Sequence, residues 1–190
     1  MRYGFVLVFL CALTLPAAAN APAKPAKPAK AQSEIDALFV KLAHAGSPEA
    51  AKPIEEQITG LFNQSGSPSV DLLMVHAAAA AQAGNTDVAK NIVITVTEIA
   101  PNYAEGWHER AAIAQSEKND ADALAYLQKT VTLNPREFAA CQEIGQILES
   151  YGDKKQALQY YRRALALDPY LEGLDKQVQQ LSRDVEGEKI

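Results

Sequence analysis

The sequence predicts an all-α protein built as a stack of helical hairpins, mainly because it repeats every 34 residues. Proline recurs at this spacing, at Pro101, Pro135 and Pro169. Other positions recur in the same register, namely Ala89, Ala123 and Ala157, and then Val93, Leu127 and Tyr161. Within each period the apolar residues follow steps of three and four, which are typical of one face of an α-helix.

Residues 1–19 predict a signal peptide. Arg2 supplies a positive start, an apolar run follows over residues 5–15, and three alanines precede the expected cleavage after Ala19. An uncleaved membrane anchor is the alternative, although the apolar run is short for a spanning helix.

Residues 20–32 predict a disordered linker, because proline at every third position favours an extended chain. Lys24, Lys27 and Lys30 add charge to it. The linker is interpreted as a solvated spacer. The alternative is electrostatic contact with anionic lipid or glycan, for which three lysines are few.

Residues 33–69 predict an irregular helical hairpin that departs from the repeat. Its first helix is expected to begin with Ser33 as N-cap. The second is expected to begin at Ser47, with Pro48 in the first turn; Pro53 would kink it or move its start to Lys52. Terminal units of such stacks are often atypical, so this hairpin is expected to cap the stack.

Three repeats follow, over residues 70–103, 104–137 and 138–171. In the third, Gly152 suits the left-handed end of one helix and Asp153 the N-cap of the next. Gly145 lacks bulk where the two helices must approach. The middle repeat has no glycine at its turn, and Asn119 is expected to adopt the left-handed conformation there.

Residues 172–190 predict a capping helix with a frayed tail. One apolar stripe would cover the last repeat while the remaining side chains meet water. The stripe consists of Leu171, Leu174, Val178, Leu181 and Val185.

These repeats resemble the tetratricopeptide repeat. The third repeat carries the resemblance best, through Ile144, Gly145, Gly152, Ala157, Tyr161, Ala164 and Pro169. The middle repeat matches through Trp107, Ala111, Ala114, Ala123, Leu127 and Pro135, and the first more weakly through Leu73, Gly84, Ala89, Val93 and Pro101. The resemblance implies a right-handed solenoid whose first helices line a concave face that binds a protein or peptide.

On that face the resemblance places a groove that looks amide-rich and nearly neutral. Its predicted partner-binding residues are Met74, Ala78, Gln82, His108, Ala112, Gln115, Gln142, Gln146 and Glu149. Lys176 and Gln180 would continue it. Some family members grip a peptide carboxylate with Lys, Asn and Arg from this face, and those residues are absent here.

The charge distribution argues against nucleic acid as a partner. The chain carries 23 acidic and 18 basic residues, and every acidic residue lies after the linker. An acidic body cannot displace counterions from a phosphate backbone. Cleavage would leave Cys141 as the sole cysteine, which is expected to be a buried core residue without a disulfide.

The sequence contains no readable catalytic or metal-binding constellation. His44, His76 and His108 lack metal-ligating partners at helical spacing, and no nucleophile–histidine–acid set or phosphate loop is present. We therefore expect no enzyme activity and no cofactor.

Together these features predict a non-enzymatic protein–protein interaction module or scaffold of the bacterial cell envelope. It would be periplasmic, monomeric and not inserted in the membrane after signal cleavage. The alternative is a structural or assembly factor of the envelope, tethered to the inner membrane through an uncleaved N-terminal segment and facing the periplasm.

Overall fold

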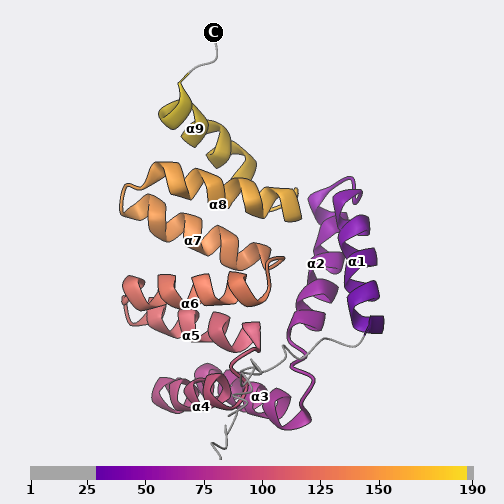
Figure 1. Cartoon of the computed structure of the whole chain (residues 1–190), viewed down its shortest axis with the longest axis vertical. Helices are drawn as coiled ribbons and strands as arrows, with labels where there is room; N and C mark the ends of the chain where they lie inside the picture. Colours follow the sequence, from indigo (N-terminus) through magenta and orange to yellow (C-terminus); the bar gives the residue numbers. More distant parts are fainter. Residues whose placement is uncertain (1–28, 188–190) are drawn as a thin grey trace, which may run out of the picture.

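A computed structural model describes residues 29–187, and these residues form nine α-helices without a β-strand (Figure 1). The helices are α1 (Ala29–Ala43), α2 (Pro48–Phe62), α3 (Pro68–Gln82), α4 (Thr86–Ile99), α5 (Ala104–Ser116), α6 (Asp120–Leu133), α7 (Phe138–Ser150), α8 (Lys154–Leu167) and α9 (Leu174–Glu186). The all-α class predicted from the sequence is confirmed for this part of the chain.

Helices α3 to α9 form one stack, in which α3/α4, α5/α6 and α7/α8 are the closely packed pairs (Figure 1). The main core is shared by α5 to α9 and includes Leu127, Ile144 and Tyr161, all fully buried. A smaller cluster, Val70, Val96 and Tyr103, joins the first pair to the start of α5. The pairs thus bury their apolar residues against one another, as stacked repeats must.

The turns within the pairs use the left-handed backbone conformation at equivalent positions. Gly84 and Gly152 have φ angles of +77° and +83°. The prediction for the middle pair is wrong, since Lys118 takes the left-handed conformation (φ +59°) and Asn119 (φ −100°) is the N-cap of α6. The side chain of Asn119 accepts a hydrogen bond from the amide of Asp122, and this capping role requires a negative φ at Asn119.

The crossing of α7 and α8 requires glycine at position 145. A β-carbon on Gly145 would lie 2.4 Å from Cε1 of Tyr161, whose ring is fully buried. The sequence prediction for Gly145 is therefore confirmed. At the turn between these helices, Asp153 caps α8 by accepting a hydrogen bond from the amide of Gln156 at 3.0 Å, also as predicted.

The first two helices begin where helix chemistry favours them. The predicted N-cap at Ser33 is wrong, because α1 begins at Ala29 and so includes residues 29–32 of the predicted linker. Residues 29–32 follow Pro28 and consist of alanine, lysine and glutamine, which favour helix. For α2 the predicted Ser47 cap is confirmed, and the helix continues through Pro53 rather than starting at Lys52.

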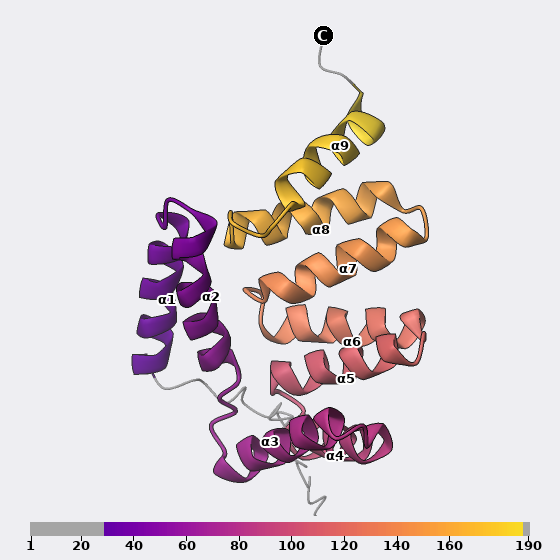
Figure 2. The same cartoon turned by 180° about the vertical axis from the view of Figure 1, so that it is seen from behind.

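The hairpin α1/α2 lies beside the stack and does not cap it, so that prediction is wrong (Figures 1 and 2). Its apolar residues Ile35, Leu38 and Ile58 pack with Phe138 of α7, next to Leu167 and Tyr170. The physical reason is that the edge where α7 begins and α8 ends offers an apolar, partly aromatic surface. The hairpin can reach this surface because residues 63–67, between α2 and α3, reverse the direction of the chain.

Phe39 holds this contact together. Its ring centroid lies 6.3 Å from that of Phe62 and 6.4 Å from that of Phe138. The Arg136 guanidinium stacks on the Phe39 ring at 3.9 Å and also pairs with Asp36. The hairpin is thereby anchored to residues that are about 100 positions away in the chain.

Helix α9 covers α8 with the predicted apolar stripe, in which Leu174 and Leu181 are buried. None of the described helices is both long and apolar enough to cross a membrane. The predicted signal peptide, the first part of the linker and residues 188–190 lie outside the described residues.

Candidate functional site

We define the first-helix face as the side chains of α3, α5 and α7 that point away from α4, α6 and α8. The nine residues predicted to bind a partner lie on these three helices. Ala78, Gln82, Ala112 and Gln146 are exposed, and Met74, His108, Gln115, Gln142 and Glu149 are half-buried. Their contact with a partner stays a prediction.

His108 lies at the centre of this face and connects two helices. Its Nε2 is 3.0 Å from Oε1 of Glu143 on α7, and its Nδ1 is 3.7 Å from Oε2 of Glu105 on α5. Only 16% of the imidazole is exposed. The ring is therefore clamped between two carboxylates, and the clamp joins adjacent repeats across the first-helix face.

The clamp keeps His108 protonated. Burial alone would lower the pKa of His108, but the hydrogen bonds and charges of Glu105 and Glu143 raise that pKa to about 11. Because the native pKa lies above the ordinary value of 6.5, the protonated ring stabilises the fold fully below pH 6.5. This stabilisation is lost as the pH rises towards the native pKa.

The middle of the first-helix face is acidic, whereas the sequence predicts a nearly neutral surface. Glu105, Glu109 and Glu143 surround the single positive charge of His108, and burial followed by the charge of Glu105 raises the pKa of Glu109. Sequence reasoning missed these carboxylates. The signal was present, because Asp71 and Glu105, and also Glu109 and Glu143, are separated by one 34-residue period.

The two ends of the first-helix face differ from its middle. At the α3 end Met74 packs on the Val70, Val96 and Tyr103 cluster, while Val75 is 62% exposed. At the α7 end Glu149 already has partners within the chain, since Tyr161 Oη donates to it at 2.8 Å and Gln177 Nε2 at 2.6 Å. The face thus runs from an apolar end to an acidic middle.

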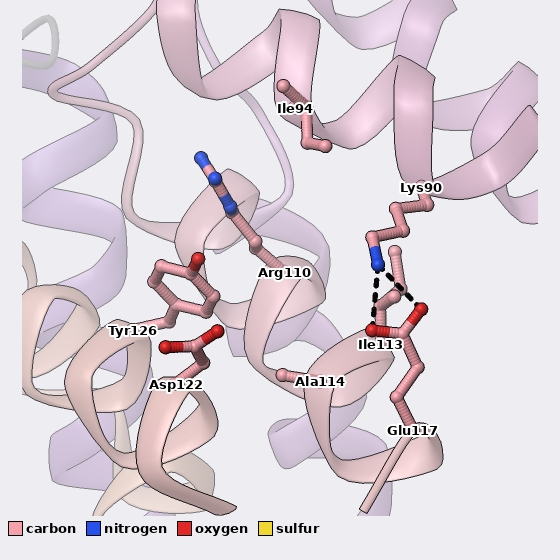
Figure 3. Close-up of a pocket in the computed structure, with 8 residues that line it drawn as sticks. All are labelled: Lys90, Ile94, Arg110, Ile113, Ala114, Glu117, Asp122 and Tyr126. Atoms are coloured by element: carbon pink, nitrogen blue, oxygen red, sulfur yellow. Dashed lines mark hydrogen bonds and ion pairs between the residues drawn. The ribbon is translucent and has the colours of Figure 1, made fainter. Parts of the chain in front are cut away.

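A small cleft opens between α4, α5 and α6, away from the first-helix face (Figure 3). Lys90 and Glu117 form an ion pair of 2.6 Å at its edge, and Arg110 stacks on Tyr126 at 4.6 Å. Its volume of about 60 Å³ is far below the roughly 300 Å³ at which small-molecule pockets begin. The cleft is therefore a gap between repeats that Arg110 spans, hydrogen bonding to Thr97.

Within residues 29–187 no group of three or more His, Cys, Asp or Glu side chains is arranged to hold a metal ion. Cys141 is fully buried, as predicted, and burial raises the pKa of its thiol. His44, which directly follows α1, and His76 on α3 are exposed.

Comparison with known proteins identifies the repeat. A family model described as tetratricopeptide repeat matches residues 138–171, which hold α7 and α8. A TPR repeat-containing protein of Rhizobium etli is 26% identical over 158 residues, covering 83% of this chain and 78% of that protein.

Solved structures share the fold at low sequence identity. The first TPR domain of Spaghetti (RPAP3), bound to an HSP90 peptide, is similar with a TM-score of 0.55 and 19% identity over 62% of this chain and 93% of that domain. MamA protein has a TM-score of 0.55 and 14% identity over 83% of this chain and 84% of its own. The Sgt2 TPR domain of Aspergillus fumigatus matches with a TM-score of 0.55 and 18% identity over 63% and 81% of the two chains. At these identities the likeness shows the fold alone.

Proposed function

Because the chain is a tetratricopeptide repeat protein, we propose that it is a non-enzymatic interaction module that binds an extended, basic segment of a partner protein on its first-helix face. The tetratricopeptide fold is typical of protein–protein interaction modules, which are generally not enzymes. The Spaghetti domain with its HSP90 peptide illustrates peptide binding by this fold.

The single observation that carries the proposal is the acidic cluster of Glu105, Glu109 and Glu143 on the first-helix face. Three carboxylates against one imidazolium leave this part of the face negative, and a cleft or face of one sign attracts the opposite charge. Lysine or arginine side chains of a partner would find acceptors there, whereas an acidic peptide would be repelled.

The apolar end of the face adds a second contact. Val75 is 62% exposed and stands one period before Glu109, so both belong to the same row of the first-helix face. A partner segment with an apolar residue next to its basic residues would therefore cover both. Exposed amides such as Gln146 would hydrogen bond to its backbone without selecting a sequence.

The proposed place of action is the bacterial periplasm, on the strength of the signal-like residues 1–19. The mass of the protein isolated from its envelope distinguishes the two possibilities. A mass that begins at Asn20 supports the periplasmic module, and a mass that retains Met1 supports the tethered assembly factor.

Binding is tested by fluorescence anisotropy with labelled ten-residue peptides that alternate basic, apolar and small residues. The Glu109→Gln/Glu143→Gln double variant is expected to weaken binding of the basic peptide about three- to tenfold, since the two exposed charge contacts together contribute about 0.7–1.4 kcal/mol. An acidic peptide of equal length should not bind the wild type.

The matched control removes two carboxylates elsewhere. Glu98→Gln/Glu172→Gln changes the net charge equally at exposed positions outside the first-helix face, and it should bind the basic peptide like the wild type. Equal weakening by both double variants would show that net charge alone attracts the peptide, and the first-helix face would lose its assignment. Circular dichroism melting verifies that each variant folds.

A further inference from the structure

A buried carboxylate lies where the hairpin α1/α2 meets the stack. Asp168, which directly follows α8, is fully buried, and its Oδ1 accepts a hydrogen bond from the amide of Tyr170 at 2.9 Å. Among the residues that the structure describes, Oδ2 of Asp168 is the buried side-chain oxygen that lacks a hydrogen-bond donor. Burying a carboxylate oxygen without a donor is costly, so the groups around Oδ2 decide how well this contact holds.

Glu55 of α2 is the side chain that faces Asp168 across the contact. Its neighbours Ile54 and Ile58 belong to the same apolar cluster as Leu167 of α8. The carboxyl of Glu55 is half-buried and lies within hydrogen-bonding reach of the Asp168 carboxyl. These two residues form the carboxyl pair of the contact. Two ionised carboxylates offer only acceptors, so a hydrogen bond between them requires one proton.

The other groups near the carboxyl pair give it little help. On α2 the exposed Glu56 adds negative charge beside Glu55, and the exposed Lys52 attracts Glu55 less than Glu56 repels it. After α8, the phenol of Tyr170 accepts a hydrogen bond from the amide of Gly46 at 2.8 Å. That bond joins the hairpin to the stack without involving either carboxyl.

The remaining titratable groups at this edge are engaged with other partners. In the link between α6 and α7, Arg136 pairs with Asp36, and Oε2 of Glu137 accepts a hydrogen bond from Nδ2 of Asn134 at 2.9 Å. His44, which follows α1, is exposed and bonds to a carbonyl of α1. Burial and mutual repulsion therefore dominate the charge state of the carboxyl pair.

These two effects favour a proton on Glu55. Burial, followed by the charge of Asp168, raises the pKa of Glu55 above its ordinary value of 4.5. Burial also raises the pKa of Asp168, although the Tyr170 amide and Glu55 oppose that rise. Because the docked hairpin binds the proton more tightly than the separated one, docking is strongest below pH 4.5. It weakens as the pH rises through the raised pKa of Glu55.

The hairpin is attached to the stack in a way that makes one proton important. Its two helices pack chiefly against each other, and the hairpin stands beside the stack (Figures 1 and 2). Each helix has 15 residues, a length at which isolated helices are marginal in water. The amides of α1 and α2 are therefore expected to exchange with solvent whenever the contact with the stack opens.

We propose that Glu55 and Asp168 share one proton across the contact between the hairpin and the stack, and that loss of this proton to solvent loosens the hairpin as the pH rises. With the proton, Glu55 donates to Oδ2 of Asp168. Without it, two buried carboxylates repel each other across the contact. The proposal goes beyond partner binding and is independent of the first-helix face.

Hydrogen exchange of the full chain, followed by mass spectrometry at pH 5.0 and 6.5 and corrected for intrinsic exchange rates, tests the proposal. Protection of α1 and α2 is expected to fall at least threefold, because each unit by which docking raises the pKa is worth up to about tenfold. Protection of α5 and α6 should stay constant, since protonated His108 stabilises the fold fully below pH 6.5.

Two conservative variants supply a donor that does not depend on pH. The amide of Glu55→Gln can donate to Oδ2 of Asp168. Asp168→Asn can donate to Glu55 while its oxygen still accepts from the Tyr170 amide. Both variants should keep the protection of α1 and α2 equal at the two pH values.

The matched controls are Glu56→Gln, which removes the neighbouring carboxylate, and His44→Gln, which removes the histidine of the hairpin. Both should retain the fall seen in the wild type. The proposal is overturned if the wild type shows no fall, if α5 and α6 fall as much as α1 and α2, or if Glu55→Gln falls like the wild type. Loss of the fall in His44→Gln overturns it as well, because the histidine would then be the responding group.

Discussion

The first and third helical pairs of the stack share one fold but differ in how much of it they bury. Helix α3 buries only Val70 and Ala77. Helix α7 buries six residues, namely Phe138, Ala140, Cys141, Ile144, Gly145 and Ile147. The difference follows from neighbours, because α7 lies between α6, α8 and the hairpin α1/α2, whereas among the described helices α3 lies at the open end of the stack. A repeat therefore owes its stability to its position in the stack as much as to its own sequence.

The largest expected difference between the two pairs comes from adding bulk at the helix crossing. Gly145→Leu should lower the free energy of unfolding by roughly 3 kcal/mol, because the new side chain would overlap the buried Tyr161 ring. Ala77→Leu is the equivalent change in α3 and should cost about 1 kcal/mol, since the smaller Val93 replaces tyrosine in the register and the open end lets α3 shift.

Urea unfolding followed by circular dichroism measures both losses. The wild type and Gly60→Ala serve as controls, because Gly60 is helical with no atom near a β-carbon, and alanine there should stabilise by about 0.5–1 kcal/mol. Equal losses from the two leucine variants would contradict the view that the third pair is the more tightly packed.

Substitutions in the turns should lower the free energy of unfolding equally in the first and third pairs. The two pairs would then differ only in how their helices pack. Gly84→Lys and Gly152→Lys are each expected to lower the free energy of unfolding by about 1 kcal/mol, because lysine is strained at positive φ. No atom lies within 4 Å of a β-carbon at either position, so contacts do not contribute. The reverse change, Lys118→Gly, should stabilise the middle pair by about 0.5 kcal/mol.

The same unfolding experiments decide the outcome. A markedly smaller loss for Gly84→Lys than for Gly152→Lys would mean that α3/α4 opens before the rest of the stack. The two regions would then differ in cooperativity and not only in the size of their cores.

Local signals account for what could be predicted from the sequence. Gly145 is needed at a close helix crossing and Gly152 at a turn with positive φ, and both requirements arise within one repeat. The spacing of Pro101, Pro135 and Pro169 predicts that such repeats stack. The position of the hairpin could not be predicted, because it depends on contacts such as Asp36 with Arg136 between segments far apart in the chain.

The candidate site could likewise be predicted only in part from the sequence. The first-helix positions of His108 and Gln142, and the recurrence of Glu109 at Glu143, could be inferred from the repeat register, but the ion pair between adjacent repeats could not. It depends on Glu143 of one repeat reaching the imidazole of the previous one, at 3.0 Å. A register identifies which residues share a face, and only the packing of adjacent helices shows which of them form ion pairs.

The smallest predicted effect concerns a histidine placed at position 74, where it would lie between two carboxylates as His108 does. Asp71 and Glu109 stand one period before Glu105 and Glu143, and Met74 stands one period before His108. Two of the three groups of the clamp are therefore already present between α3 and α5, although one oxygen of Asp71 accepts a hydrogen bond from the Ser65 amide.

Met74→His is expected to be more stable relative to the wild type at pH 6 than at pH 9, by about 0.5–1 kcal/mol. The sign follows from the carboxylates, which would raise the folded-state pKa of the new imidazole as they raise that of His108 to about 11. Its stabilisation is then present below the unfolded-state pKa and lost as the pH rises. Urea unfolding at both pH values measures the difference, and Met74→Gln controls for the lost apolar contact. If the two variants show the same pH dependence, the carboxylates at the open end do not converge on position 74, and the first pair differs from the third in backbone alignment as well as in burial.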